Sequence, residues 1–416
     1  GAILRQEIYA LDGTDKEPHP YTVTEQNFTI RRLQTKAGNR HPVFLTHGRE
    51  AITFQYERNP ADPRIAQTLT LEVDDFGNVL KSAAVGYGRR QADPALSSAD
   101  QARQAERHVT CSENAFTNSV DSTDAYRTPL PSESRAYELA GLELEPGETR
   151  LGFDQVLGAV ASATPLAYED TFTANLVQKR LIEHVRTQFR PNDLGAAQGD
   201  PLALLPLGQL ESLALPGESY KLALTPGLIT TTCGAKVTDT MLEEGRYVRL
   251  TDHDGWWIPS GRSFFSPGTN DNPATELVQA KDHFFLARRI RDPFHRDGFE
   301  TEATVTYDVH DLLVTQTRDA LDNFVLAQHD YRVLQPRLMT DPNGNRAEVA
   351  FDTLGIVVGT AVMGKTSETK GDSLLGFSAD LDEATALTHL DDPFADPHAI
   401  LQRASTRMVY DLFAYL

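Results

Sequence analysis

The chain has 416 residues, of which 40% are hydrophobic and 24% are charged, and this length exceeds that of one typical compact domain. Its 39 basic and 59 acidic residues give a net charge of -20, which argues against a nucleic-acid-binding surface and against a polybasic face for an anionic membrane. We therefore expect two domains or one extended repetitive body, with no nucleic-acid partner and no direct membrane binding.

Strand-like segments predominate along the chain. Polar and apolar residues alternate over 27–33 and 68–73, as they do in a strand with one buried face. The segment 176–189 is ambiguous, and alternation within its 181–187 half favours a strand there. Segments rich in β-branched and aromatic residues predict further strands at 304–307, 312–317, 348–351 and 356–362.

Helical signals are few and short. Residues 98–107 are good helix formers behind a serine cap. Residues 238–245 predict a short helix that is capped at its start and ends at glycine. Two more helices are expected at 380–390 and 396–404. The predicted fold is therefore mainly β, with a few short helices.

A recurring turn joins several of these strand-like runs. Its form is Asp-x-x-Gly, found at Asp74 to Gly77, Asp341 to Gly344 and Asp352 to Gly355, with a degenerate copy at Asp319 to Asp322. The aspartate side chain can accept backbone N–H bonds across the turn, and glycine supplies the positive φ that closes a hairpin. The repeats predict an antiparallel sheet that is built hairpin by hairpin.

These turns resemble the YD, or rearrangement-hotspot (RHS), repeat, whose core is Tyr-Asp-x-x-Gly-Arg/Asn. The pairs Tyr307-Asp308 and Tyr410-Asp411 fit its start, although neither is followed by glycine at the expected place. Longer strings carry more specificity: NPADPRI at 59–65, SAAVGYGRR at 82–90, LPGESYKL at 215–222, WWIPSGR at 256–262, DYRVLQP at 330–336 and VVGTAVMGK at 357–365. Together they resemble the middle-to-C-terminal region of the B component of bacterial ABC-type (Tc) insecticidal toxin complexes, over nearly the whole chain.

The resemblance implies an architecture and a function. In that family the B and C components together form a hollow β-sheet shell of RHS repeats, which encloses the cytotoxic C-terminal part of the C component. The B component also carries a β-propeller that docks on the A component, a translocation channel. By this resemblance, residues 1–165 are the β-rich middle region of the toxin B component and residues 166–416 are an RHS-repeat shell segment, both part of one continuous wall.

The family's other parts are not recognisable in this sequence. It shows no SpvB-like segment, no propeller and none of the self-cleaving aspartyl-protease core of the C component. Strand-like sequence at 409–416 and the lack of a signal pattern at the start also lead us to expect that both ends are cuts in a longer polypeptide. Docking on the A component and payload release are therefore not assigned to this chain.

The densest group of chemically active side chains consists of Asp252, His253, Asp254, Trp256 and Trp257. Two carboxylates, an imidazole and two indoles suggest a sugar platform with an acid and a base. The carboxylates are only two residues apart, however, and nothing local places them across a scissile bond. We therefore favour a turn, with the tryptophans packed in a core or wall.

Metal sites have little support. Residues 341–345 resemble the start of an EF-hand loop, but Arg346 and Asp352 stand where that loop needs glycine and glutamate, so a repeat turn is favoured over a calcium site. His41 and His47 are expected on the same side of one strand, too far apart to share a metal. We predict neither a metal nor a cofactor.

The two cysteines are Cys111 and Cys233, too few for a disulfide scaffold, and we expect two buried, reduced thiols with one bridge as the alternative. Cys111 lies near His108, but the separation of three residues and the lack of a positively charged surrounding favour a core residue.

We therefore predict a non-catalytic structural segment of a secreted toxin complex, with no catalytic, cofactor-binding or metal-binding residues. Its partners would be the C component with its payload, and the A component through parts of the B component outside this chain. The alternative is a secreted or cell-surface RHS-type β-protein that binds glycans or other surfaces. A hydrolase would need two carboxyl groups about 5 to 10 Å apart in a cleft, and this distinguishes the two.

Overall fold

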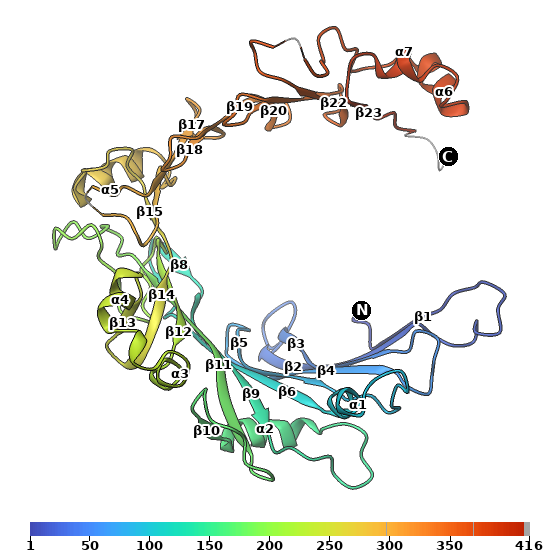
Figure 1. The fold of residues 1–416 in the computed structure, drawn as a ribbon, viewed down its shortest axis with the longest axis vertical. Coiled ribbons are helices and arrows are strands. Elements are labelled where there is room, and N and C mark those ends of the chain that lie inside the picture. Colours follow the sequence, from blue (N-terminus) through green and yellow to red (C-terminus); the bar gives the residue numbers. More distant parts are fainter. Residues whose placement is uncertain (297, 369, 412–416) are drawn as a thin grey trace. The chain divides into compact units, whose positions relative to one another are not determined.

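The computed structural model describes residues 1–296, 298–368 and 370–411, and within them antiparallel strands dominate, with a few short helices (Figure 1). The predicted mainly β, hairpin-rich fold is thereby confirmed. The chain divides into two compact units. Unit 1 comprises Gly1–Asn192 with Ala203–Ser260, and unit 2 comprises Asp193–Leu202 with Gly261–Leu416.

Unit 1 is built on a 12-stranded sheet, in which neighbouring strands are mostly consecutive in the chain. Its strands are β1 (Arg5–Ile8), β2 (Thr22–Gln34), β3 (Val43–Gln55), β4 (Arg64–Val73), β5 (Val79–Gly86), β6 (His108–Phe116), β9 (Pro131–Ala140), β10 (Thr164–Leu166), β11 (Gln178–Phe189), β12 (Pro216–Leu224), β13 (Val248–Leu250) and β14 (His253–Pro259), with β7 (Val120–Ser122) and β8 (Ala125–Arg127) as a separate pair. Its helices are α1 (Ser98–Ala105), α2 (Phe153–Ser162), α3 (Pro226–Thr232), the 3-10 turn η1 (Gly234–Lys236) and α4 (Asp239–Glu244).

The core of unit 1 lies between one face of this sheet and helix α2. Alternate residues of β4, from Ile65 to Leu71, are buried on that face. Val85, Cys111 and Leu139 on neighbouring strands belong to the same cluster as the buried helix residues, which include Val156. Because alternate strand residues face opposite sides, this pattern leaves the other face of the sheet without cover from its own core.

The uncovered face of unit 1 is made of small, uncharged side chains in the middle of the sheet. One row of directly paired residues runs across β2 to β6 as Gln26, Ala51, Thr68, Ala84 and Thr110. None of these five residues is buried. The row reaches its first charged members only at β9 and β11, where Glu138 pairs with Arg180.

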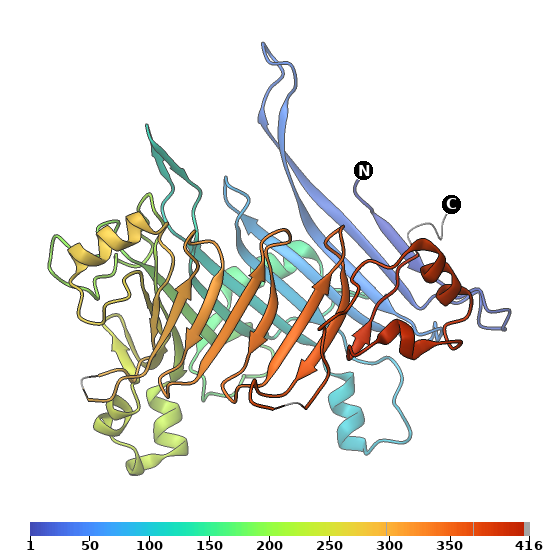
Figure 2. The ribbon, with the colours of Figure 1, turned by 90° about the horizontal axis from the view of Figure 1, so that it is seen from above.

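Unit 2 is a nine-stranded antiparallel sheet whose strands follow one another in chain order, as Figure 2 shows for the orange strands. Its strands are β15 (Arg262–Phe264), β16 (Arg289–Arg291), β17 (Glu302–Tyr307), β18 (Val314–Arg318), β19 (Phe324–Asp330), β20 (Gln335–Thr340), β21 (Arg346–Phe351), β22 (Val357–Met363) and β23 (Thr406–Arg407). Its helices are α5 (Pro273–Asp282), α6 (Glu383–Asp391) and α7 (Pro397–Leu401).

The predicted Asp-x-x-Gly turns all close hairpins. In the β4–β5 turn, Asp74 Oδ1 accepts hydrogen bonds from the backbone N–H groups of Phe76 and Asn78, at 2.9 and 2.8 Å. Asp352 makes the same two bonds in the β21–β22 turn, and Asp341 and Asp319 make one or both of them in theirs. The glycine position has positive φ in every copy, including +63° at Asp322 in the degenerate one.

The sheet of unit 2 separates charged from uncharged side chains between its two faces. Strand pairing places every charged residue of its described strands on one face: Arg262, Arg289, Arg291, Glu302, Arg318, Asp330, Arg346, Glu348 and Arg407 by register, and Arg337 at a bulge through its contacts with Gln328 and Glu348. The other face, here called the neutral face, includes Ile290, Ala303, Val305, Thr317, Val325, Ala327, His329, Met339, Ala347, Val349, Thr360, Val362 and Thr406. None of the residues of the neutral face is buried.

Several local predictions need correction. The strand expected at 312–317 begins only at Val314, because a turn that is tied to the Asp308 carboxylate occupies the two leucines before it. His41 lies in the loop before β3 and not on a strand with His47. Of the strand expected at 409–416, residues 409–411 form none and the rest lie outside the described residues. Helices α2, α3 and α5 were not predicted.

The helical predictions that the structure confirms are the capped ones. Ser97 accepts a hydrogen bond from Asp100 N–H at the start of α1, and Thr238 does the same for Met241 at the start of α4. The helices expected at 380–390 and 396–404 are present as α6 and α7.

Candidate functional site

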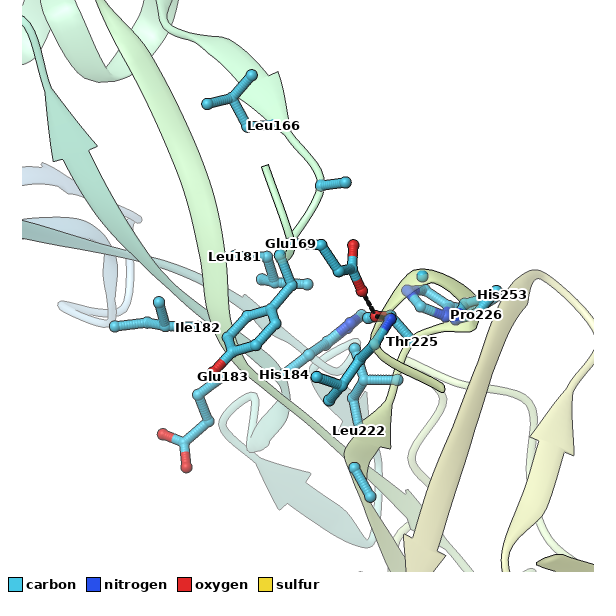
Figure 3. Close-up of a pocket in the computed structure, with 15 residues that line it drawn as sticks. Leu166, Glu169, Leu181, Ile182, Glu183, His184, Leu222, Thr225, Pro226 and His253 are labelled. Carbon is cyan, nitrogen blue, oxygen red and sulfur yellow. Dashed lines mark hydrogen bonds between the residues drawn. The ribbon is translucent and has the colours of Figure 1, made fainter. Parts of the chain in front are cut away.

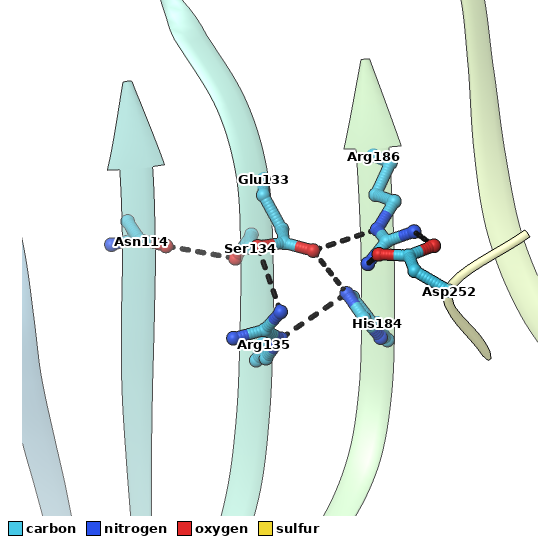
Figure 4. Close-up of polar contacts among 7 residues, drawn as sticks. All are labelled: Asn114, Glu133, Ser134, Arg135, His184, Arg186 and Asp252. Carbon is cyan, nitrogen blue, oxygen red and sulfur yellow. Dashed lines mark hydrogen bonds and ion pairs between the residues drawn. The ribbon is translucent and has the colours of Figure 1, made fainter. Parts of the chain in front are cut away.

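A partly buried charge network lies where β9, β11 and the turn between β13 and β14 meet (Figure 4). Glu133 on β9 stands directly opposite Arg186 on β11, and Arg135 stands opposite His184. All four side chains therefore leave the same face of the sheet. Asp252 reaches Arg186 from the turn that precedes β14.

Arg186 is the centre of this network. Its Nε donates to Glu133 Oε1 at 2.7 Å, and its Nη1 and Nη2 donate to the two oxygens of Asp252 at 2.6 and 2.8 Å. His184 Nε2 is hydrogen-bonded to the same Glu133 oxygen at 2.7 Å, and Arg135 pairs with the second oxygen at 2.9 Å. Two carboxylates are thus held by one guanidinium.

The electrostatics of the network are those of a structural charge cluster. Burial opposes ionisation of Glu133, but hydrogen bonds from His184 and Arg186 outweigh it and hold the pKa of the carboxyl below its ordinary value. The hydrogen bond from Arg186 likewise lowers the pKa of Asp252. A general acid of a glycosidase needs a carboxyl with a raised pKa, and neither member supplies one.

The two tryptophans of the candidate group are packed inside. Trp256 and Trp257 on β14 are 2% and 0% exposed. Trp257 makes edge contacts with the rings of His184 and His253, at centroid distances of 4.7 and 5.3 Å, and Arg249 lies over Trp256. The prediction that they are packing residues is confirmed, since a stacking platform for a sugar must be accessible.

The structure therefore divides the group of side chains at 252–257 that the sequence offered as a candidate site. Asp252 joins the Arg186 network and His253 joins the tryptophan cluster, whereas Asp254 is exposed. Burial lowers the pKa of both His253 and His184, so both imidazoles favour the neutral form. Sequence reasoning missed Glu133 and Arg186, whose only local signal was a pair of strands that carry charges at alternate positions.

A groove of about 500 Å³ lies above this cluster in unit 1 (Figure 3). Its walls are largely apolar and include Leu166, Leu181 and Leu222, and His184 and His253 lie on one side of it. Glu169 at its rim is hydrogen-bonded to Thr225, the residue that caps helix α3. The groove is thus a cleft beside a packed cluster, and the carboxylates of Glu133 and Asp252 are not among its lining residues.

Two further findings bear on the other candidates. No group of three or more His, Cys, Asp or Glu side chains with the arrangement of a metal site occurs among the described residues, and 341–345 forms a repeat turn. In the described part of the chain, no helix has the length and apolar character that are needed to cross a membrane.

The cysteine prediction is partly corrected. Both cysteines are free, as expected, but only Cys111 is buried, within the core cluster of unit 1. Burial raises the pKa of its thiol to about 11. Cys233 is half-buried at the end of the short helix α3.

These features define a class of protein. Two antiparallel sheets, built largely from hairpins in chain order, define a repetitive β-sheet protein. The chain is similar to known proteins both in sequence and in fold.

Residues 1–129 match the family described as the insecticide toxin TcdB middle/C-terminal region. The fold is similar to parts of the chains in crystal structures of TcdB2-TccC3-Cdc42 (TM-score 0.61, 22% identity, 93% of this chain and 18% of that one) and TcdB2-TccC3 (TM-score 0.60, 23% identity, 92% and 18%). It is also similar to part of a Tc holotoxin pore from Photorhabdus luminescens (TM-score 0.61, 23% identity, 93% and 17%).

The resemblance to the B component of Tc toxins that the sequence predicted is confirmed by these matches. This chain spans less than a fifth of the length of each of those solved chains. No curated protein matches its sequence.

Proposed function

We propose that this chain is a non-catalytic wall segment of a toxin B component, forming part of a B–C shell that encloses the cytotoxic region of a C component. In this proposal residues 1–165 are the family's middle region and residues 166–416 the RHS-repeat segment of the same wall. The complex is secreted, and contact with an A-component channel is made by parts of the B component outside this chain.

The neutral face of unit 2 is the observation that carries the proposal. It extends over eight strands without a charged side chain, and members such as Met339 and Val362 remain 44% and 65% exposed. Antiparallel sheets commonly bury an apolar face and leave a polar face in water. Here the charged face holds the ion pairs, such as Arg289 and Arg291 with Glu302, and the neutral face holds none.

A container wall explains why one exposed face of the sheet carries no charge. Small aliphatic and hydroxyl side chains offer an enclosed polypeptide neither ion pairs nor deep pockets that would hold it in place. The middle of the uncovered face of unit 1 has the same character, with Ala51, Thr68 and Ala84 in one row. We infer that these faces line the lumen of the shell.

The chemistry of the charge network supports a non-catalytic role. Arg186 pairs with both Glu133 and Asp252, and the lowered pKa of each carboxyl favours its ionised form. Alanine at Asp252, His253 and Asp254 should leave the activity of the toxin complex intact. A specific loss of activity with an unchanged melting temperature would contradict a purely structural role.

Limited proteolysis tests the enclosure. The chain is co-purified with its C component and treated with a protease of broad specificity. We expect the C-terminal region of the C component to resist cleavage in the complex and to be digested when the C component is treated alone. Equal digestion rates in the two samples would refute the proposal.

A second variant tests the face itself. Glutamate at Thr317 and Ala347, two positions on the neutral face that are already exposed, should leave the fold intact because nothing covers them. We expect slower release or poorer packaging of a positively charged payload. Matched glutamates at Gln316 and Thr340, on the charged face, serve as the control and should have no such effect.

A further inference from the structure

The outer part of the β2–β3 hairpin extends beyond the sheet of unit 1. Strand β4 pairs with β3 only over Glu50–Gln55, and β1 pairs with β2 only over Thr22–Glu25. Residues 28–34 and 43–48 pair with each other, and no other described strand pairs with them. This segment, residues 28–48, is here called the distal hairpin, and Figure 2 shows it as the long blue ribbon that projects from its neighbours.

The charge of the distal hairpin is opposite to that of the chain. It contains the four basic residues Arg31, Arg32, Lys36 and Arg40 and no acidic residue, in a chain with a net charge of -20. Arg31 pairs with Asp75 at 3.0 Å. The other three have no ion-pair partner among the described residues, although acidic side chains are abundant elsewhere in the chain.

The two faces of the distal hairpin differ in their surroundings. On one face Arg31 and Leu45 stand opposite each other, and they lie against the β4–β5 turn at Asp75 and Gly77. This contact fixes the direction of the ribbon.

The other face carries Ile30 and Phe44, which remain 66% and 51% exposed, with Arg32 directly opposite Phe44. Isolated two-stranded ribbons are marginally stable in water, and exposed apolar side chains beside unpaired cations add to the cost.

We propose that the distal hairpin is a docking element for an acidic protein surface that also offers an apolar groove. Ile30 and Phe44 enter the groove, and Arg32, Lys36 and Arg40 meet carboxylates at its rim. Charge complementarity carries the choice of partner, because the distal hairpin of this acidic chain carries three cations without an ion-pair partner and no acidic residue. That this partner is the C component rests on the proposed function.

An anionic bilayer fits the hairpin less well. The tip, residues 35–42, has no large apolar side chain to anchor in lipid, and the exposed apolar residues lie along the shaft instead. Each cation near an anionic membrane contributes about 1 kcal/mol, while the acidic remainder of the chain is repelled by the same surface. A protein partner can place its carboxylates locally and avoid that repulsion.

The test compares two triple variants of the same net charge. The first carries Arg32→Glu, Lys36→Glu and Arg40→Glu. The second, the control, carries Lys16→Glu, Arg103→Glu and Lys236→Glu, three exposed cations of unit 1 outside the hairpin. The Kd for the purified C component is measured for the unmodified chain and for both variants at low and high salt, and binding to phosphatidylserine vesicles is measured in parallel.

We expect the hairpin variant to bind the C component at least about tenfold more weakly at low salt, with a flatter dependence on salt, and the control to bind within about twofold of the unmodified chain. Replacement of Ile30 and Phe44 by serine should weaken binding at both salt concentrations.

Any of the following results would overturn the proposal. An equal loss of affinity in the two variants would show a general charge effect. An unchanged affinity for the C component, together with vesicle binding that only the hairpin variant loses, would assign the hairpin to a membrane. If the unmodified chain itself does not bind the C component, the proposed function fails as well, whereas normal binding by the hairpin variant refutes the docking element alone.

Discussion

Replacement of Arg186 by methionine removes the centre of the charge network and keeps most of its apolar stem. Glu133, with a side chain only 11% exposed, then loses one of its two arginine partners and retains Arg135 and the hydrogen bond with His184. Breaking a buried ion pair from one side costs about 3 to 5 kcal/mol when no other partner remains. With two partners left, we expect the free energy of unfolding to fall by about 2 to 3 kcal/mol.

Asp252→Asn is the matched comparison. The Asp252 side chain is 61% exposed, so solvent screens its pair with Arg186, and the loss should be about 0 to 1 kcal/mol. The two replacements therefore separate the buried half of the network from its exposed half.

Urea unfolding followed by tryptophan fluorescence is the assay. The chain has two tryptophans, and both lie on β14 beside the network, so the emission reports on this part of unit 1. A loss of 2 to 3 kcal/mol should move the midpoint down by roughly 1 M, given a slope of about 1 to 3 kcal/mol per molar urea. If the methionine variant unfolds at the same concentration as the Asp252→Asn variant, the network does not stabilise the sheet as argued.

The remaining predictions concern pH, the repeat turns and the thiols. Because burial lowers the pKa of His184 and His253, their contribution to stability is complete above their ordinary pKa of about 6.5 and is lost as the pH falls below it; a fluorescence midpoint that stays constant from pH 7.5 to 5 would contradict this. Gly344→Ala, at φ +84°, should destabilise unit 2 by about 1 kcal/mol or more in thermal unfolding, whereas Asp322→Gly in the degenerate copy should change the melting temperature little, and the reverse order would refute the turn argument. Iodoacetamide should modify the half-buried Cys233 in the native protein and leave the buried Cys111 intact, which mass spectrometry of tryptic peptides can check.

Features that depend on a few neighbouring residues could be predicted from the sequence. In each repeat turn the aspartate accepts hydrogen bonds from backbone groups two or four residues further on, so the signal and its structural effect lie within one short segment. Capped helices such as α1 and α4 were predictable for the same reason. Helix α5 had a usable local signal that was overlooked, an asparagine cap followed by proline at Asn272-Pro273.

Other elements had no such local signal. Helix α2 begins at a glycine cap, contains Gly158, and owes its place to the burial of residues such as Val156 against strands that are distant in sequence. Helix α3 ends in three threonines, which favour strands, and is held by the cap at Thr225 and its hydrogen bond to Glu169.

The sequence by itself determined the mainly β fold, the positions of the hairpin turns and the resemblance to the toxin B component. The tertiary structure decided which side chains meet. In the sequence, Arg186 is 53 residues from Glu133 and 66 residues from Asp252. Only the register of β9 with β11 and the path of the β13–β14 turn bring the three together. It also decided that the uncharged residues of successive strands share one face, because a slip of one residue in any pairing would move a strand's side chains to the opposite side of the sheet.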